Sequence, residues 1–556
     1  MADSNQLKPT ARWYVSSFHK KKDDVNVVGV VEKIEYTDES GNKTYKDNLH
    51  WYYDPQRVFY VTQPGWRNYK YKKEFEDINL CDKYICRDSE LEERVGAALG
   101  YFGYRKRPLR QLCASPYLYV ADIPTEDLIK QEYVRRQPQT IAPFTRGGLD
   151  IETEVRGEKR INVITFIHEH EIFTCALKEY CRIHLGDDKF KAATKEDCLG
   201  VIDKYIGKYM KDHNFTLTFE IVDTELDLIK WIFARIHEKK TNFVGVWNLS
   251  FDIPKIIERI VSLGADPEEI MCHPSVPKEY RYLNWFEDKS NTKQKAHITD
   301  RWHWLTLAGY TQFLDSMCLY ARLRKASGKE SSYSLDYISN KVLGQGKLHL
   351  EGEISNHWYE QTYKFLDYIA YNINDVLVMQ LMEFKTEDMI ALTALSGNSL
   401  MSEFSKQTIQ VRNDAYVFAK QHGKVPATSS MNMFNEYDEM MIKVGGTVLP
   451  PNKAIGVSIR ALEETNGRTL ATVLTNDLDV SSFYPSVIEA FNISKESCLA
   501  TIINVNGHTE QENEILNGGI VQPRVGAMDV GTNFFGLNNY REALDAFNVD
   551  LASGKI

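Results

Sequence analysis

The chain has 556 residues, of which 43% are hydrophobic. This length suggests about three or four domains, with enough apolar side chains to supply their cores. No run of 18 apolar residues and no apolar segment near the N-terminus occurs, which argues against a membrane span and a secretory signal. The nine cysteines are odd in number and form no CxxC or CxxH pair, so we expect free thiols in a reducing compartment rather than a zinc site.

The formal net charge of −10 argues only weakly against nucleic acid binding. Nucleic acids are held by local basic surfaces, and an acidic metal site adds negative charge elsewhere. Three basic clusters are candidates for such surfaces, although each is also typical of an ordinary solvated face: Lys20–Lys22, Arg105–Arg107 with Arg110, and Arg322–Lys325.

The first part of the chain is predicted to be a mostly β domain over residues 1–146. Short strands with turns are expected between residues 12 and 63, and residues 90–100 have helical spacing. Residues 115–137 indicate a strand followed by a helix that begins near Pro124. Nothing in this block indicates catalysis.

A pair of carboxylates opens the second block. Asp150 and Glu152 are two residues apart on a predicted strand, so both point to one face of a sheet. Residues 163–167 and 171–177 continue as strands, which together predict a three-stranded antiparallel meander. Two carboxylates on one face repel each other unless a cation lies between them. A polar strand face without a ligand is the alternative.

A third carboxylate lies at a strand-to-helix junction. An amphipathic helix is predicted over residues 225–239, and a buried strand over 243–247. The sequence Asn248-Leu249-Ser250-Phe251-Asp252 follows this strand, and a new helix is expected from Ile253. Helix capping is the alternative interpretation of Asp252.

A fourth carboxylate lies on a long predicted helix from about residue 360 to 384. Tyr371 and Asp375 are four residues apart and therefore share a face of this helix. A phenol and a carboxylate there could orient a water and bind a metal, whereas a half-buried Tyr with a solvated Asp is the alternative. Asp315 and Asp336, on intervening segments, are expected to belong to the scaffold.

Taken in order, these three pieces resemble the motifs of the DEDDy 3′–5′ exonuclease, the RNase H-like proofreading domain of family B DNA polymerases. The resemblance implies a nuclease domain over residues 147–387 with two Mg²⁺ or Mn²⁺ ions, because hard cations prefer carboxylate oxygens. The implied metal ligands are Asp150, Glu152, Asp252 and Asp375. Tyr371 would position the attacking water, and Asn248 and Phe251 would contact DNA. One departure is that Asn248 and Phe251 have two residues between them, where many relatives have three.

The region after the nuclease also resembles these polymerases. Residues 388–448 are similar to the segment of the T4-type bacteriophage enzymes that returns to the N-terminal domain and then links to the palm. Gly445 and Gly446 resemble a Gly-rich element that contacts template. A Gly pair is weak evidence alone, because loops use it often.

The string from Asp479 to Ile488 resembles motif A of family B DNA polymerases. It follows a predicted buried strand, and Pro485 suits the first turn of a helix. The resemblance implies that Asp479 and the Val480 carbonyl bind the catalytic metals. It also implies that Ser482, Phe483 and Tyr484 bind the incoming nucleotide, with Tyr484 as the steric gate against ribose. A plain strand–turn–helix is the alternative.

The predicted fold class is therefore α/β multidomain: a mostly β N-terminal domain, an RNase H-like exonuclease domain and the first part of a palm over residues 449–556. The fingers, motif C and thumb of the family are not found in the sequence. We therefore expect one piece of a split viral replicative polymerase, with the other parts on a second chain. The implied partners are primer–template DNA with a single-stranded 3′ end, dNTPs and a sliding clamp, in the host-cell cytoplasm. The alternatives are a stand-alone 3′–5′ exonuclease with a relic motif A, and a non-catalytic DNA-binding subunit.

Overall fold

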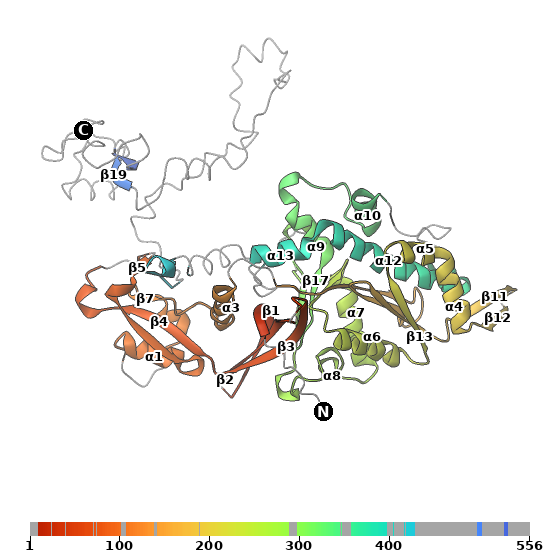
Figure 1. Cartoon of the computed structure of the whole chain (residues 1–556), viewed down its shortest axis with the longest axis horizontal. Coiled ribbons are helices and arrows are strands. Elements are labelled where there is room, and N and C mark those ends of the chain that lie inside the picture. The colour runs from red at the N-terminus through yellow and green to blue at the C-terminus, as the bar shows by residue number, and fades with distance from the viewer. Residues whose placement is uncertain are drawn as a thin grey trace, which may run out of the picture. The chain divides into compact units, whose positions relative to one another are not determined.

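The computed structural model describes most of the chain up to residue 428 (Figure 1). The described residues are 9–23, 25–38, 40–69, 72–73, 75–101, 107–137, 142–187, 189–288, 297–344, 346, 357–396, 404, 416, 419–428 and the backbone of 498–502 and 527–531. The chain divides into two compact units, Met1–Ile442 and Lys443–Ile556. In the second unit, β19 (Cys498–Ile502) pairs antiparallel with β20 (Ala527–Gly531).

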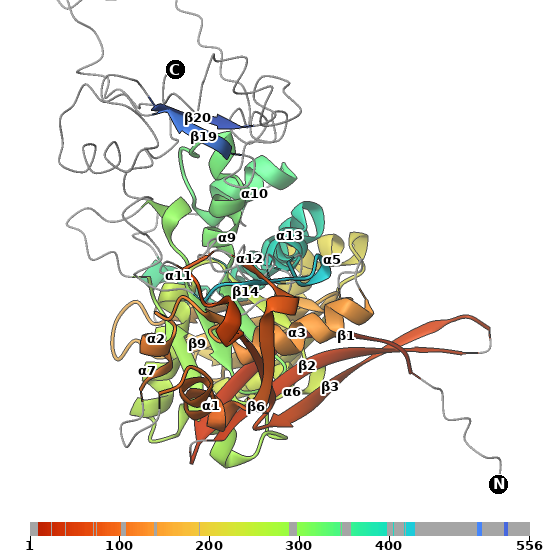
Figure 2. The same ribbon diagram turned by 90° about the vertical axis from the view of Figure 1, so that its left-hand side faces the viewer.

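The chain begins with a three-stranded antiparallel sheet in the order β1-β2-β3. Its strands are β1 (Pro9–Lys22), β2 (Val25–Thr37) and β3 (Lys43–Tyr53). Figure 2 shows them side by side as a long twisted ribbon. The predicted strands between residues 12 and 63 are thus confirmed, and they are longer than the sequence pattern indicates.

Two smaller sheets complete this region. One has the order β6-β4-β7 and contains β4 (Gln56–Thr62), β6 (Cys81–Arg87) and β7 (Leu118–Tyr119). The other pairs β5 (Phe75–Asp77) with β18 (Lys424–Pro426), which brings a late segment of the chain onto an early one. The helices here are α1 (Leu91–Ala98), α2 (Leu109–Leu112) and α3 (Thr125–Arg136), and Pro124 directly precedes α3 as expected.

An eight-stranded mixed sheet forms the centre of the larger unit, in the order β13-β10-β9-β8-β14-β17-β16-β15. The predicted meander is confirmed, because β8, β9 and β10 pair antiparallel. β14 lies parallel between β8 and β17. The bounds are β8 (Arg146–Thr153), β9 (Ile161–His168), β10 (Glu171–Leu177), β13 (Thr216–Val222), β14 (Phe243–Val246), β15 (Leu283–Phe286), β16 (Trp304–Leu307) and β17 (Gln312–Asp315). The hairpin of β11 (Arg182–Gly186) and β12 (Lys189–Ala192) forms a separate two-stranded sheet.

Helices cover both faces of the central sheet (Figure 1). One core contains apolar residues of β8 together with α6 and α7, and the opposite core contains residues of β9 with α4 and α12. The helices are α4 (Lys195–Ile202), α5 (Lys208–Asp212), α6 (Glu225–Lys239), α7 (Leu249–Ser262), α8 (Pro267–Met271), α9 (Ser316–Leu323), α10 (Leu335–Leu343), α11 (His357–Tyr363), α12 (Phe365–Thr386) and α13 (Asp388–Ser396). The described part is therefore mixed α/β, as predicted.

Two helix boundaries differ from the sequence prediction. The helix expected over residues 360–384 is two helices, α11 and α12, which are separated at Lys364. The backbone of Lys364 has φ −133° and ψ 37°, outside the helical range, and no proline or glycine signals this break. The helix expected from Ile253 begins four residues earlier, at Leu249.

The N-terminal sheet is joined to the central sheet by a buried polar link. Lys33 Nζ on β2 lies 2.6 Å from Asp47 Oδ1 on β3. The same Asp47 oxygen accepts a hydrogen bond of 3.0 Å from Asn242 Nδ2, one residue before β14. Trp13 and Val31 pack in one cluster with Phe243 of β14. These contacts fix the N-terminal sheet against the sheet that carries the site.

Among the described residues, no helix combines the length and the apolar character that crossing a bilayer requires.

Candidate active site

Three of the predicted metal ligands meet at the centre of the larger unit. Asp150, Glu152 and Asp375 each offer a carboxylate oxygen, and these oxygens all lie within 4.8 Å of one another. Asp150 and Glu152 alternate along β8 with Leu149 and Ile151, whose side chains enter the core on the other face. Asp375 comes from the middle of α12, which packs on that carboxylate face. Like charges at this separation repel each other unless a proton or a cation lies between them.

Asp252 lies in the first turn of α7, directly after β14. Because β14 pairs with β8, the start of α7 is near the strand that carries Asp150 and Glu152. The Asp252 side chain is buried, with 4% of its surface exposed, and it is not part of the group within 4.8 Å. The N-cap of α7 is Asn248 rather than Asp252. Asn248 forms no side-chain cap bond and instead accepts a hydrogen bond of 3.1 Å from Ser250 Oγ.

Glu152 is held by a tyrosine that the sequence reasoning missed. The hydroxyl of Tyr368 on α12 donates a hydrogen bond of 2.5 Å to Glu152 Oε2. Burial first, and then the Glu152 charge, raise the pKa of Tyr368, so this hydroxyl stays protonated and donates. Gln361 Nε2 donates to the Thr153 carbonyl (2.7 Å) and to the Tyr368 hydroxyl (3.3 Å). The end of β8 is therefore tied to both α11 and α12.

Asp150 also has a partner that was not predicted. Asn372 Nδ2 donates a hydrogen bond of 2.7 Å to Asp150 Oδ2, and the Asn372 side chain is fully buried. The signal for both missed residues was present in the sequence. Tyr368 and Asn372 precede Asp375 by seven and three positions, so all three residues share one face of α12. An amide and a phenol on that face can orient carboxylates without carrying charge.

Tyr371, the predicted water-positioning residue, lies on α12 beside these groups. Its ring stacks on that of Tyr368 with centroids 5.8 Å apart and an interplanar angle of 12°. The ring of His357 meets it edge-on at 6.3 Å. Tyr371 is half-buried, whereas only 1% of the Tyr368 surface is exposed. Tyr368 therefore serves as an internal support, and Tyr371 is the more accessible of the two phenols.

A cavity of about 590 Å³ reaches the carboxylate group at Glu152, the member of that group that lines it. Glu152, Tyr368 and His357 line it together with Phe251, whose side chain is 51% exposed. Lys159 and Lys255 supply positive charge to its wall, although Lys255 Nζ also pairs with Glu258 at 3.0 Å. The cavity thus combines carboxylates, an exposed aromatic ring and cations. It offers room for a nucleotide-sized group beside the possible metal ligands.

A second group with metal-ligand chemistry is buried nearby: His303, Asp315 and Cys318. Nδ1 of His303 accepts the Asp288 N–H at 3.0 Å, which places the ring proton on Nε2 and leaves no nitrogen lone pair for a metal. Asp315 accepts the Cys318 N–H at 2.8 Å and caps α9. These contacts agree with the expected scaffold role of Asp315.

The remaining predicted site residues lie outside the described residues. They are Gly445, Gly446, Asp479, Val480, Ser482, Phe483 and Tyr484. The predicted palm site therefore stays a prediction from sequence.

Comparison with known proteins relates the chain to a phage protein. No protein-family model matches the chain. The chain is 25% identical over 289 residues to a DNA-directed DNA polymerase of Escherichia phage RB69. The aligned region covers 50% of this chain and 27% of the phage protein. This similarity supports a relationship between the chain and DNA-directed DNA polymerases.

Proposed function

We propose that the chain carries a metal-dependent 3′–5′ exonuclease that removes nucleotides from single-stranded DNA ends, of the kind that proofreads for a DNA polymerase. The observation that carries the proposal is the group of Asp150, Glu152 and Asp375 within 4.8 Å, beside a cavity of about 590 Å³. The similarity to a phage DNA polymerase supports a polymerase-related function with DNA and dNTPs as ligands.

The donor set fits a hard divalent cation. All three ligand candidates are carboxylates, and no thiolate or imidazole belongs to their group. Asp150, Glu152 and Asp375 would hold Mg²⁺ or Mn²⁺, with Asp252 as a fourth carboxylate at the start of α7. Such ions lower the pKa of bound water and neutralise the charge of a phosphodiester.

The protein's own groups would then bind and orient the DNA end. The exposed ring of Phe251 offers an apolar surface to the terminal base or sugar. Lys159 and Lys255, which line the same cavity, would attract the phosphates of the DNA strand. Tyr371, on the face of α12 that carries Asp375, would orient the attacking water. Tyr368 and Asn372 hold Glu152 and Asp150 in place.

The test uses the full chain, Mg²⁺ and a 5′-labelled single-stranded oligonucleotide. The wild-type chain should shorten the label-bearing strand stepwise, and a blocked 3′ end should stop the reaction. Asp150→Asn and Asp375→Asn should each lower the rate by at least a hundredfold while the circular dichroism spectrum is unchanged. Asp223→Asn is the matched control, because Asp223 is a surface carboxylate with 75% of its side chain exposed.

Wild-type rates in both site variants would refute the assignment. Binding of DNA without any cleavage by the wild-type chain would instead favour the non-catalytic DNA-binding alternative. Adding primer–template and all four dNTPs to the same assay measures synthesis. Lengthening of the primer would show that this chain carries a working polymerase site.

A further inference from the structure

A row of aromatic rings and cationic side chains leads away from the candidate active site. Its nearest neighbour at the cavity is His357 at the start of α11, which lines the cavity. The next residue, Trp358, is 36% exposed, and the guanidinium of Arg156 lies 4.3 Å over its ring. Arg156 is itself exposed and belongs to the β8–β9 connection that also supplies Lys159 to the cavity wall. The rim of the cavity therefore carries a stacked cation and aromatic ring.

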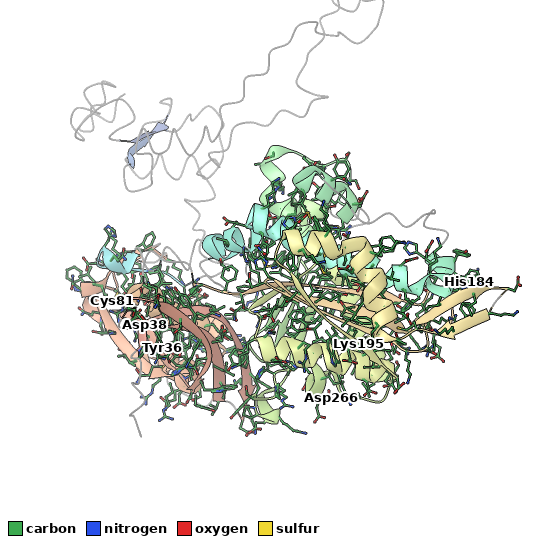
Figure 3. The ribbon with its side chains drawn as sticks, turned by 45° about the vertical axis from the view of Figure 1, so that its right-hand side comes forward. Tyr36, Asp38, Cys81, His184, Lys195 and Asp266 are labelled. Atoms are coloured by element: carbon green, nitrogen blue, oxygen red, sulfur yellow. The ribbon has the colours of Figure 1, made fainter. Side chains whose placement is uncertain are left out.

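The row continues from α11 to the β11–β12 hairpin. The ring of Tyr363 meets Trp358 edge-on at 6.1 Å. Tyr363 also stacks with Phe190 of β12, with centroids 5.8 Å apart and an interplanar angle of 26°. A second guanidinium, that of Arg182 on β11, lies 4.2 Å over the Phe190 ring. Figure 3 shows the hairpin, marked by His184, extending outward from the central sheet.

The outer part of the row is positively charged. Lys189 and Lys191 are both exposed on β12 and flank the more buried Phe190, as strand alternation requires. The same two segments also contain acidic residues: Glu154 and Glu158 in the β8–β9 connection, and Asp187 and Asp188 in the sequence before Lys189. The basic residues of these two segments are Arg156, Lys159, Arg160, Arg182, Lys189 and Lys191, so six cations stand against four carboxylates in the sequence.

We propose that this row, from Trp358 and Arg156 to Phe190, Lys189 and Lys191, binds the single-stranded DNA segment that precedes the 3′-terminal nucleotide. The proposal rests on the proposed nuclease function. Aromatic rings stack on bases of any sequence, guanidinium planes stack on bases as well, and lysines attract the backbone. The row adjoins the cavity through the β8–β9 connection, because Val155, the neighbour of Arg156, and Lys159 both line the cavity, which is the end where the terminal nucleotide would lie.

A purely structural role would be to hold the hairpin against α11. Such a role accounts for the contacts of Tyr363, but it does not require exposed faces on Trp358 and Tyr359, which is 40% exposed. Nor does it require exposed lysines on β12. The two roles differ in what they predict for DNA strands of different length.

The experiment measures binding of fluorescent oligothymidylates of 4 and 12 nucleotides to the full chain by anisotropy, in an Asp150→Asn background that prevents degradation. Trp358→Ala should weaken binding of the 12-mer about tenfold and of the 4-mer by less than about twofold, because only the longer strand reaches the row. Lys189→Glu with Lys191→Glu should weaken the 12-mer alone. The double change should also reduce the slope of log affinity against log salt by about 1.4.

Two matched controls separate these effects from general changes. Trp66→Ala removes an exposed tryptophan of the N-terminal region, which is 50% exposed. Lys230→Glu with Lys278→Glu makes the same charge change at exposed lysines of other segments. Neither control should alter the 12-mer affinity.

The proposal would be overturned if the chain without row substitutions binds the 4-mer and the 12-mer with equal affinity. It would also be overturned if neither row variant changes the affinity for the 12-mer. The lysine double variant keeps the test decisive if Trp358→Ala fails to fold. This assay measures binding without cleavage, so it is independent of the nuclease assay. If the wild-type chain never degrades DNA but the row variants lose 12-mer binding, the proposed nuclease function is refuted and the proposed DNA-binding row is retained.

Discussion

The Tyr368 hydroxyl donates a hydrogen bond of 2.5 Å to Glu152 Oε2, and thereby joins α12 to strand β8 at the candidate active site. The two residues are 216 positions apart in the sequence. Because the Tyr368 hydroxyl donates to Oε2, the other carboxylate oxygen of Glu152 is left for a cation. The same hydrogen bond fixes the orientation of the Glu152 carboxylate. Interactions of this kind orient metal ligands and affect metal affinity without touching the metal.

Tyr368→Phe removes this donor and keeps the ring. We expect the nuclease rate to fall by about 10- to 100-fold at low Mg²⁺, and to recover partly at high Mg²⁺, because Glu152 loses its orientation. A Mg²⁺ titration of single-strand degradation measures the effect. Tyr359→Phe, at a 40% exposed phenol, is the control. An unchanged Mg²⁺ dependence would show that Glu152 needs no support from Tyr368.

Asn372→Asp places a carboxylate within 2.7 Å of Asp150, where an amide now donates. The two like charges should raise the pKa of the carboxylate pair, so that one of them holds a proton at neutral pH. We expect a loss of more than tenfold at pH 7 that becomes smaller as the pH rises, since deprotonation restores the ligand. Rate measurements from pH 6 to 9 test this, with Asn284→Asp at an exposed position as control. A pH-independent loss would contradict the explanation.

Asp315→Asn should stabilise the protein at neutral pH. Burial raises the pKa of Asp315 to about 7, although the backbone amides of Cys318 and Leu249 act in the opposite direction. Between about pH 4 and pH 7 the folded protein keeps a proton that the unfolded chain loses, so the free energy of unfolding falls as the pH rises. The asparagine of the variant cannot ionise. The difference in free energy of unfolding between the variant and the wild type should therefore grow over this pH range to at most about 4 kcal/mol. Urea unfolding at pH 5 and pH 8 measures the difference, and a constant difference would refute it.

Arg259→Met should destabilise the protein by about 3–5 kcal/mol, because it leaves the Glu225 charge buried and unpaired. Arg259 Nη2 lies 2.5 Å from Glu225 Oε2, and the two side chains are 8% and 3% exposed. Adding Glu225→Gln removes the charge and keeps an acceptor for the Ile161 N–H, so much of the loss should be recovered. Chemical denaturation of the single and double variants decides this. Lys178→Met, in an exposed pair, should change stability by less than about 1 kcal/mol.

Local patterns in the sequence predicted those features of the site that are determined within a single strand or helix. Alternation placed Asp150 and Glu152 on one face of β8, and helical spacing placed Tyr371 and Asp375 on one face of α12. The antiparallel meander followed from short connections between consecutive strands. These features depend on periodicity and turn length, which a single sequence contains.

Features that depend on contacts between distant elements could not be predicted in the same way. The parallel pairing of β13 with β10, and the hydrogen bonds of Gln361 to Thr153 and Tyr368, arise only after the chain has folded. The start of α7 at Leu249 is a further example, because a buried carboxylate from β17, Asp315, lies at that helix end. Tertiary context of this kind overrides local preference.

The side-chain contacts between β8 and α12 also have a consequence for protein synthesis. Asp150 and its hydrogen-bond partner Asn372 are 222 residues apart, so the carboxylate group cannot assemble until α12 has left the ribosome. Contacts of such long sequence separation form late, after the intervening loop has closed. A nascent chain would therefore emerge without an assembled carboxylate group, and the proposed nuclease activity would require that α12 has been synthesised.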